Sequence, residues 1–448
     1  MSGTATDHPM RGFLIETWGC QMNVHDSEKM AGLLERCGYA PVSAPEEADL
    51  ILLNTCSVRE KAAEKVFSRL GQLRAYKRRN PELLIGVCGC VAQAEGEAIF
   101  RRAPHVDLLM GPRNIAHLGT LLEQARRDGR SISLARDDDP IIFPSETTAR
   151  ASGPRAYVTV MEGCNKACAF CIVPFTRGRE VYRRPDEILE EVRSLAARRY
   201  CEIELLGQNV NAYRSDGDDL AALLHKVDRV PGVRRIRFTT SHPGHLKSGI
   251  MDAMRDVPGV CNHLHLPVQS GSDRVLSSMN RGYSRSKYMQ KIAGLRARVP
   301  DISFSTDIIV GFPGETSDDF DQSLSLVREV GFDQLYAFTY SPRPGTTATT
   351  FDCPVPEDEK SARLRELLQV QDAIVSRRNA AAVGRTYEVL LDGRSTLDET
   401  LLKGRTTCNR IVNVRGDIPT GRRFLDVRIT RAHAHSLSGE PLSTAGAA

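Results

Sequence analysis

Long apolar runs are absent from this 448-residue sequence. No stretch of about 18 consecutive apolar residues occurs, which excludes a membrane-spanning helix. Residues 1–11 are polar and lack the apolar segment of a secretory signal, so we expect no export. With 41% hydrophobic residues, the chain can build a sizeable core and does not resemble the small secreted domains that depend on disulfides. Its length predicts two to four domains at about 150 residues each.

Cysteine, in contrast, is plentiful, with 12 residues in the chain. Several of these thiols stand in short Gly-containing loops rather than in the spaced pattern of a disulfide framework. Clustered thiols of this kind are typical of metal ligation in a reducing compartment. We therefore expect a cytoplasmic protein that binds metal through cysteines.

Cys164, Cys168 and Cys171 follow a strand-like run in the order C-x3-C-x2-C. Three thiolates on one tight loop can ligate three irons of a 4Fe–4S cluster, which is normally held by four cysteines. An incomplete set predicts an open coordination site, as in catalytic metal centres. Structural zinc is the alternative, but it requires four N or S ligands and usually two C-x2–4-C pairs.

The first block, residues 11–127, alternates strand-like and helix-like segments. Residues 13–17, 50–54 and 84–87 read as strands, and the helix after the first strand would be capped by Asp26 or Ser27. Helices between strands predict a small parallel α/β sheet. In such a sheet, the loops at the carboxyl ends of the strands form the ligand crevice.

Three further cysteines, Cys20, Cys56 and Cys90, each follow one of these strands directly. Because the carboxyl ends of parallel strands lie at one edge, these thiols are expected to meet around a second metal site. Cys88 competes with Cys90 for the third position, and Cys90 is favoured because it stands in the turn. The cysteines without a partner at ligand spacing are expected to be structural: Cys37, Cys201, Cys261, Cys353 and Cys408.

A polar, Pro-containing linker is expected over residues 128–152, before a second block at 153–382. Helical stretches separate six candidate strands, at 156–161, 202–206, 235–239, 262–266, 303–309 and 334–340. Six β/α units predict an incomplete (β/α)6 TIM-like barrel with its chemistry on the loops after the strands. The residues there that would hydrogen-bond a nucleoside cofactor are Gln208, Asn209, Gln269, Ser270 and Asp307.

The third block, residues 384–432, reads as short strands around turns at 392–393 and 415–417, followed by a tail at 433–448. It holds ten Lys and Arg against six Asp and Glu, a net charge of +4. A small basic β-barrel favours contact with a phosphate backbone. On charge alone, a solvated β surface is the alternative.

Several strings resemble the methylthiotransferase family of radical S-adenosylmethionine (SAM) enzymes, over nearly the whole chain from Phe13 to Arg431. They are TWGCQMN at 17–23, NTCSVREK at 54–61, MEGCNK at 161–166, VPFTRG at 173–178, HLPVQSGS at 265–272 and YSPRPGT at 340–346. The 161–166 and 173–178 strings are similar to the branch that acts on dimethylallyladenosine in tRNA. Other branches act on threonylcarbamoyladenosine or on an aspartate of a ribosomal protein.

This resemblance implies two 4Fe–4S clusters, one on Cys164, Cys168 and Cys171 that binds SAM at its open iron, and one on Cys20, Cys56 and Cys90. The first would generate a 5′-deoxyadenosyl radical, and the second would deliver sulfur. The implied reaction is methylthiolation of C2 of N6-dimethylallyladenosine at position 37 of the tRNA anticodon loop. A flavodoxin- or ferredoxin-like electron donor, a monomeric enzyme and a C-terminal RNA-binding TRAM module are further implications.

Aromatic residues that could stack on a base are few, at 6% of the chain. Tyr157, Phe175 and Tyr340 are the candidates, although all three could be barrel core. A function of another class, a non-catalytic iron–sulfur RNA binder acting as a redox sensor, would leave the six barrel units and the open iron site unexplained.

Overall fold

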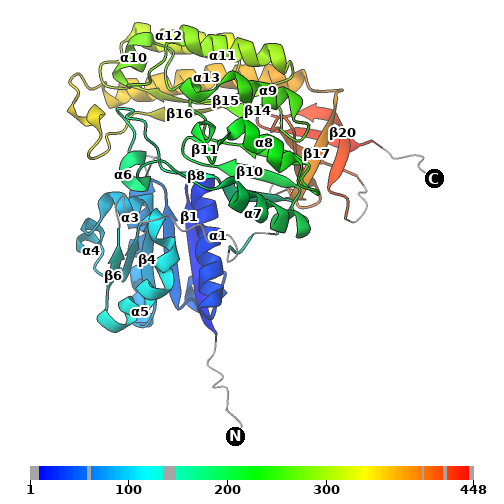
Figure 1. The fold of residues 1–448 in the computed structure, drawn as a ribbon. Helices are drawn as coiled ribbons and strands as arrows, with labels where there is room; N and C mark the ends of the chain where they lie inside the picture. The colour runs from blue at the N-terminus through cyan, green and yellow to red at the C-terminus, as the bar shows by residue number, and fades with distance from the viewer. Residues whose placement is uncertain are drawn as a thin grey trace. The chain divides into compact units, whose positions relative to one another are not determined.

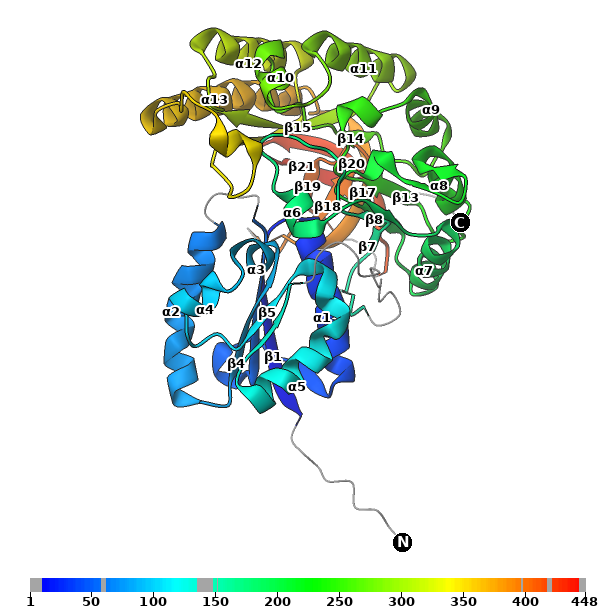
Figure 2. The same ribbon diagram turned by 60° about the vertical axis from the view of Figure 1, so that its left-hand side comes forward.

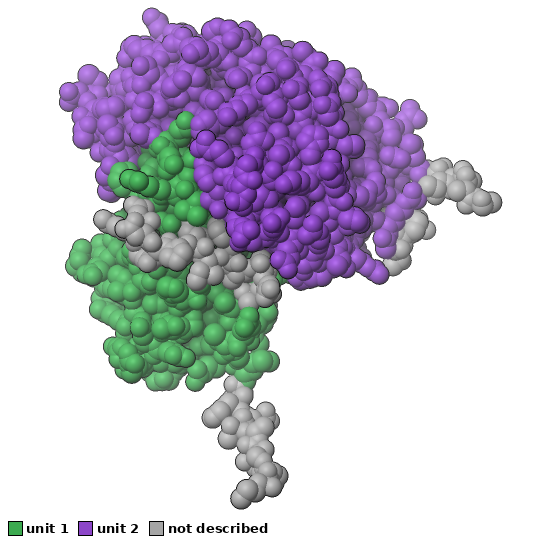
Figure 3. Space-filling view, viewed as in Figure 1, with its two compact units in different colours: residues 1–151, 162–166, 171–181 green, residues 152–161, 167–170, 182–448 purple. Residues whose placement is uncertain are grey.

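The computed structural model describes residues 10–57, 62–134, 148–150, 152–395, 398–416 and 421–442. The chain divides into two units (Figure 3), the first made of residues 1–151, 162–166 and 171–181, and the second of 152–161, 167–170 and 182–448. Parts of the predicted motifs and segments lie outside the described residues: 58–61, most of the linker (135–147 and 151), Asp417 and the end of the tail (443–448).

A six-stranded parallel sheet forms the centre of the first unit, in the order β2-β1-β3-β4-β5-β6. The strands are β1 (Arg11–Trp18), β2 (Tyr39–Pro41), β3 (Leu50–Thr55), β4 (Leu84–Gly89), β5 (Leu108–Met110) and β6 (Ser131–Ser133). The predicted parallel sheet is therefore confirmed. It extends beyond residue 127, because β6 lies in the segment expected to be linker.

Helices cover both faces of this sheet (Figure 2). They are α1 (Gln21–Arg36), α2 (Ala62–Arg79), α3 (Cys90–Glu95), α4 (Ala98–Arg102) and α5 (Leu118–Asp128), with single turns η1 (Pro45–Glu47) and η2 (Pro112–His117). Side chains alternate along a strand, so Leu50 and Leu52 pack against α1 and α5 on one face. Ile51 and Leu53 pack against α2 and α4 on the other.

Helix α1 begins at Gln21, so the prediction that Asp26 or Ser27 caps it was wrong. Cys20 occupies the cap position with extended backbone, and its N–H donates to Asn23 Oδ1 at 3.3 Å. An Asn three residues into a helix can satisfy a free backbone donor at the start, as a capping box does. The helix therefore starts earlier, and Asp26 lies inside it and is buried.

Six parallel strands of the second unit form the incomplete barrel that the sequence predicts, as two ladders, β13-β10-β7 and β14-β15-β16 (Figure 1). The strands are β7 (Arg155–Thr159), β10 (Glu202–Leu206), β13 (Arg235–Phe238), β14 (His263–His265), β15 (Ser303–Val310) and β16 (Gln334–Thr339). The helices of this part are α7 (Pro185–Ala197), α8 (Leu220–Asp228), α9 (Ser248–Asp256), α10 (Asp273–Ser278), α11 (Arg285–Arg298), α12 (Ser317–Val330) and α13 (Glu357–Ala380). Among the described residues, no helix is both long and apolar enough to cross a membrane.

A closed five-stranded β-barrel follows α13, in the order β17-β18-β19-β21-β20. Its strands are β17 (Thr386–Arg394), β18 (Leu402–Thr406), β19 (Ile411–Val414), β20 (Phe424–Ala432) and β21 (Leu437–Pro441). The predicted small β-barrel is confirmed, and it takes in β21 from the segment expected to be tail. The predicted turn at 392–393 was wrong, because β17 continues through a bulge there, with Gly393 at φ +137°.

Buried arginines hold this β-barrel against the amino ends of the (β/α) strands. Arg235, the first residue of β13, donates to the Arg405 carbonyl at 2.8 Å and to Glu388 Oε1 at 2.8 Å. Arg237 donates to the Thr406 carbonyl at 2.7 Å. The β-barrel therefore closes the end of the strands opposite to the loops expected to carry the chemistry.

Arg235→Met should lower the free energy of unfolding by about 3–5 kcal/mol, because the substitution leaves buried acceptors without their cation. Arg235 is only 2% exposed. Denaturant unfolding followed by circular dichroism measures the change. As a control, Arg255→Met removes an exposed arginine paired with Asp256 and should change the free energy by less than about 0.5 kcal/mol. Equal effects of the two substitutions would contradict the proposed role of the buried contact.

Candidate metal centres

The carboxyl edge of the parallel sheet brings Cys20, Cys56 and Cys90 to one place. The strand ends are in register, because Trp18 pairs with Thr55 and Thr55 with Gly89. The Cys56 N–H donates to the Trp18 carbonyl at 2.9 Å. A Cβ at Gly19 would lie 2.8 Å from Cys56 Cβ, so the approach of these loops requires glycine.

Electrostatic contacts link the three thiols. The pKa of Cys20 is lowered to about 6, mainly by the hydrogen bond with Cys56 and also by the charge of Arg177, which together outweigh the effect of burial. Burial raises the pKa of Cys90, while Arg177 opposes that rise and Cys20 lies close enough to add to it. Thiolates are the form that binds metal, so this edge favours ligation.

Cys88 points away from this site, into the apolar core formed with α1 and α5. It is 0% exposed, and burial raises the pKa of its thiol, so it stays protonated. Gly89, at φ +82°, breaks the strand alternation between Cys88 and Cys90, and a Cβ there would lie 2.4 Å from Asn54 Oδ1. This geometry supports Cys90 as the third ligand.

The C-x3-C-x2-C loop contributes to both units: Cys164 and Cys171 belong to the first and Cys168 to the second. All three cysteines are partly exposed. The Cys164 N–H donates to the Gly178 carbonyl at 3.1 Å. Gly163 has φ +81°, and a Cβ there would lie 2.0 Å from the Arg179 carbonyl oxygen, so only glycine fits directly before Cys164.

Within the second unit, a buried arginine contacts Cys168. Arg281 Nη1 donates to Cys168 Sγ at 3.3 Å, and its Nη2 donates to the Pro267 carbonyl at 3.0 Å. Asn280 Nδ2 donates to the Ala167 carbonyl at 2.7 Å, and the Ala169 N–H donates to the Met279 carbonyl at 3.0 Å. The segment 279–281 therefore holds this part of the loop, which the sequence analysis did not anticipate.

Within the described part of the chain, no three His, Cys, Asp or Glu side chains converge closely enough to bind a single metal ion. A 4Fe–4S cluster places each cysteine on a different iron, so its ligands need not converge on one point. The two cysteine triads fit that larger group by residue type and by their position after strands. The thiol of Cys20 is exposed and has a lowered pKa, and those of Cys164, Cys168 and Cys171 are partly exposed.

A buried charge cluster lies next to the triad of Cys20, Cys56 and Cys90. It consists of Asp26, Lys29, Glu162 and Arg177. Arg177 Nη2 donates to Asp26 Oδ2 at 2.5 Å, and Lys29 Nζ lies 3.5 Å from Glu162 Oε1. None of the four side chains is more than 6% exposed. Sequence reasoning missed this cluster, because nothing in the local pattern distinguishes these charges from solvated ones. The only signal was that Arg177 belongs to the quoted 173–178 string.

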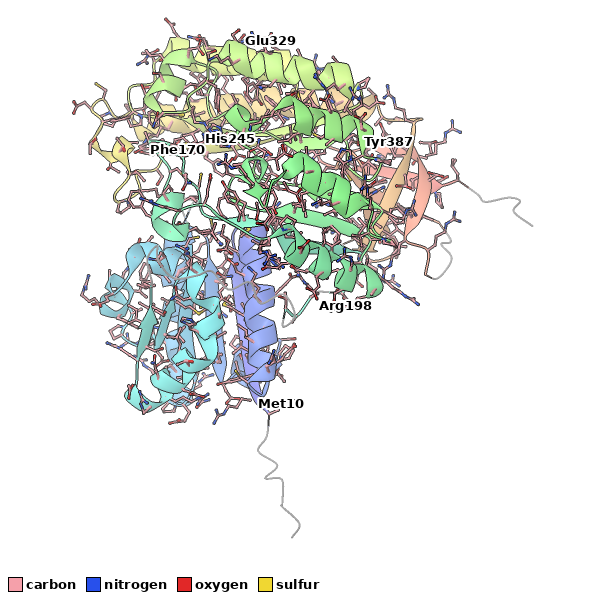
Figure 4. The ribbon with its side chains drawn as sticks, viewed as in Figure 1. Met10, Phe170, Arg198, His245, Glu329 and Tyr387 are labelled. Carbon is pink, nitrogen blue, oxygen red and sulfur yellow. The ribbon has the colours of Figure 1, made fainter. Side chains whose placement is uncertain are left out.

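Of the five residues expected to contact a nucleoside cofactor, Asp307 lies within β15 and the other four lie beyond the carboxyl ends of β10 and β14. Asn209 is 1% exposed, and its Nδ2 lies 3.1 Å from Nδ1 of His245, which is labelled in Figure 4. Asp307 Oδ1 lies 3.5 Å from His265 Nε2. These contacts fix both side chains in a polar rim, and the two histidines were not predicted.

Ser270 and Gln269 form hydrogen bonds within the protein that fix the loop after β14. Ser270 Oγ accepts from the Ser272 N–H at 3.2 Å and lies 3.4 Å from Ser323 Oγ. Gln269 has φ +75° and exchanges backbone hydrogen bonds with β15. Gln208 is partly buried directly after β10.

The aromatic candidates differ in exposure. Tyr340 is 8% exposed and packs edge to face on Phe312, with ring centroids 5.3 Å apart. Tyr157 is partly buried within β7. Phe175 is 57% exposed, which leaves it as the aromatic of the three that is free to meet a base.

Three families match successive parts of the chain. Uncharacterized protein family UPF0004 matches residues 12–111, the Radical SAM superfamily matches residues 158–327, and the TRAM domain matches residues 380–442. The first match runs from β1 to β5, the second from β7 to β15, and the third covers the closed β-barrel.

Relatives and solved structures agree with these matches. The tRNA-2-methylthio-N(6)-dimethylallyladenosine synthase of Chromobacterium violaceum is 49% identical, with 98% of this chain and 100% of that protein covered. The same-named protein of Halorhodospira halophila is 50% identical, with 97% and 93% covered. The radical SAM methyltransferase TsrM from Kitasatospora setae is similar in fold alone, with a TM-score of 0.54, 14% identity and 75% of each chain covered.

The predicted resemblance is therefore confirmed at the level of sequence and fold. Near-half identity is found over an alignment that covers almost the full length of the chain and all three matched regions. The chain belongs to the family of the tRNA-2-methylthio-N(6)-dimethylallyladenosine synthases, within the Radical SAM superfamily.

Proposed function

We propose that this protein methylthiolates C2 of N6-dimethylallyladenosine at position 37 of tRNA. The observation that supports this most is the pair of cysteine triads, one at the carboxyl ends of three parallel strands and one in the loop after β7 and β8 (Met161–Glu162), in a chain that matches synthases of this name over nearly its whole length. One triad alone would suffice for a radical enzyme, while a second offers a separate site for sulfur.

Cys164, Cys168 and Cys171 would hold the radical-generating cluster, and Cys20, Cys56 and Cys90 the auxiliary cluster. When bound, SAM on a reduced 4Fe–4S cluster supplies the 5′-deoxyadenosyl radical, and the auxiliary cluster supplies the sulfur. Arg281 holds Cys168 by its hydrogen bond to the sulfur. Asn209, beyond β10, and Asp307, within β15, present polar atoms that would orient the nucleoside part of SAM.

The closed β-barrel would bind the tRNA backbone through only part of its positive charge. The side chains of Arg410 and Arg423 are used in contacts with the (β/α) part of the same unit, for example Arg410 with Asp333 at 3.0 Å. The exposed cations that remain are Arg385, Arg394, Arg415, Arg422, Arg428 and Arg431. Anticodon-loop bases are single-stranded and can be splayed onto an aromatic ring, a role that the exposure of Phe175 allows.

The family resemblance also supports the remaining expectations about partners. The electron donor would be a small flavodoxin- or ferredoxin-like protein, and the enzyme would act as a monomer. Its tRNA substrate and its thiol-rich sites fit the reducing conditions of the cytoplasm.

The reconstituted protein should contain about eight irons, in two 4Fe–4S clusters. Replacing Cys164, Cys168 and Cys171 by Ala should leave about four irons, and replacing Cys20, Cys56 and Cys90 should do the same. Cys88→Ala is the matched control for Cys90→Ala, and only the latter should disturb the auxiliary cluster. Anaerobic iron and sulfide analysis measures these contents. Full iron in either triple variant, or loss of a cluster in Cys88→Ala, would show that the ligands are assigned wrongly.

The two sites should also differ in chemistry, which tests the proposed function itself. The variant with Cys20, Cys56 and Cys90 changed to Ala should still cleave SAM to 5′-deoxyadenosine under reducing conditions, but make no 2-methylthio product on dimethylallyladenosine tRNA. The variant at Cys164, Cys168 and Cys171 should lose both activities. Chromatography with mass spectrometry detects both products. Methylthio product from the first variant, or 5′-deoxyadenosine from the second, would refute this division.

Binding to tRNA should weaken when the exposed arginines Arg428 and Arg431 of β20 are changed to Ala. Each lost phosphate contact should reduce the slope of log K against log salt by about 1. Arg328→Ala, an exposed arginine on α12, serves as the control. Point variants are preferable to removing the β-barrel, because its removal would take away the hydrogen-bond partners of the buried Arg235. An unchanged dissociation constant and salt slope in the double variant would argue against this surface.

A further inference from the structure

Arg177 joins the segment after Cys171 to the site of the auxiliary cluster. It is the last residue of α6 (Val173–Arg177), which packs against α3, the helix that begins with Cys90. Its guanidinium acts on Cys20 through its charge, and on Cys90 through both its charge and a side-chain hydrogen bond. All of these residues belong to the first unit.

The guanidinium of Arg177 donates to Asp26 and contributes a hydrogen bond to Cys90, but its Nη1 has no hydrogen-bond partner among the described residues. This nitrogen is buried and lies 4.0 Å from Glu162 Oε2, too far for a hydrogen bond. Asp26 Oδ1 and Glu162 Oε2 are likewise buried without a hydrogen bond. An unpaired buried donor is costly. A donor of this kind beside Cys20 and Cys90 suits a site where an anionic acceptor binds.

We propose that Arg177 is a positioning residue for the auxiliary cluster, which raises the cluster's reduction potential through its positive charge, and that Asp26 counterbalances it. The inference rests on the proposed assignment of Cys20, Cys56 and Cys90 as cluster ligands. The sulfur atoms of the cluster and of its cysteines would supply the acceptor that Arg177 Nη1 lacks.

The physical basis is the dependence of cluster potentials on local charge and on hydrogen bonds to sulfur. Reduction adds an electron, so a nearby buried cation favours the reduced state and a buried anion disfavours it. Screening is weak in the interior, where Arg177 and Asp26 are 3% and 1% exposed. The two residues should therefore shift the potential in opposite directions, a pattern that a purely structural role would not produce.

The experiment isolates the auxiliary cluster by using the full chain with Cys164, Cys168 and Cys171 changed to Ala. Redox titration followed by electron paramagnetic resonance gives its midpoint potential. Arg177→Met should shift the potential to more negative values, and Asp26→Asn to more positive values. The double variant should return close to the parent, and Arg177→Lys should retain most of the parent potential. Arg179→Met, at an exposed arginine two residues away, is the control and should cause no shift.

The outcomes separate this inference from the proposed function. If the parent with only Cys20, Cys56 and Cys90 holds no cluster, the ligand assignment fails and the inference fails with it. If the cluster is present and neither Arg177→Met nor Asp26→Asn moves its potential, the inference alone is overturned. If Arg177→Met loses the cluster, the result for Asp26→Asn decides. A midpoint potential shifted to more positive values supports the inference, and an unchanged midpoint potential overturns it.

Discussion

The register of the parallel strands β1, β3 and β4 is the constraint on which the auxiliary site depends. Trp18, Thr55 and Gly89 are paired across the three strands, so the chain leaves the sheet at the same level in each. Three cysteines within two residues of those ends therefore meet, although they are far apart in sequence. A shift of one residue in any of these strands would exchange the two faces of that strand, and in β4 it would turn Cys88, now in the core, toward the opposite side.

In the second unit, six parallel strands also bring functional residues to one end, although they do not close into a complete barrel. Its amino end is filled by the β-barrel, through arginines that would be unstable if left unpaired. Its carboxyl end carries Cys168, Arg281 and the polar rim. The amino ends of the strands therefore contribute to stability and the carboxyl ends carry the residues for chemistry, as in complete TIM barrels.

Much of this could be predicted because it depends on local pattern. Buried parallel strands read as short apolar runs, and cysteines directly after them mark the sites. The start of α1 was missed because an unusual cap, Cys20 with Asn23, replaces the acidic or hydroxyl residue expected there. The bulge in β17 was read as a turn because Asp-Gly is a turn signal in isolation, whereas β18 and β20 pair along both sides of that strand. The pairing of Asp26 with Arg177 joins residues 151 positions apart, which no local pattern contains.

The central claim is that this chain places a methylthio group on dimethylallyladenosine in tRNA. Mass spectrometry of tRNA nucleosides from cells that lack the protein, with and without a plasmid carrying it, tests this most directly. We expect that 2-methylthio-N6-dimethylallyladenosine disappears, that N6-dimethylallyladenosine accumulates, and that the plasmid restores the modified nucleoside unless Cys20 is changed to Ala. An unchanged level of the 2-methylthio nucleoside in cells without the protein would contradict it.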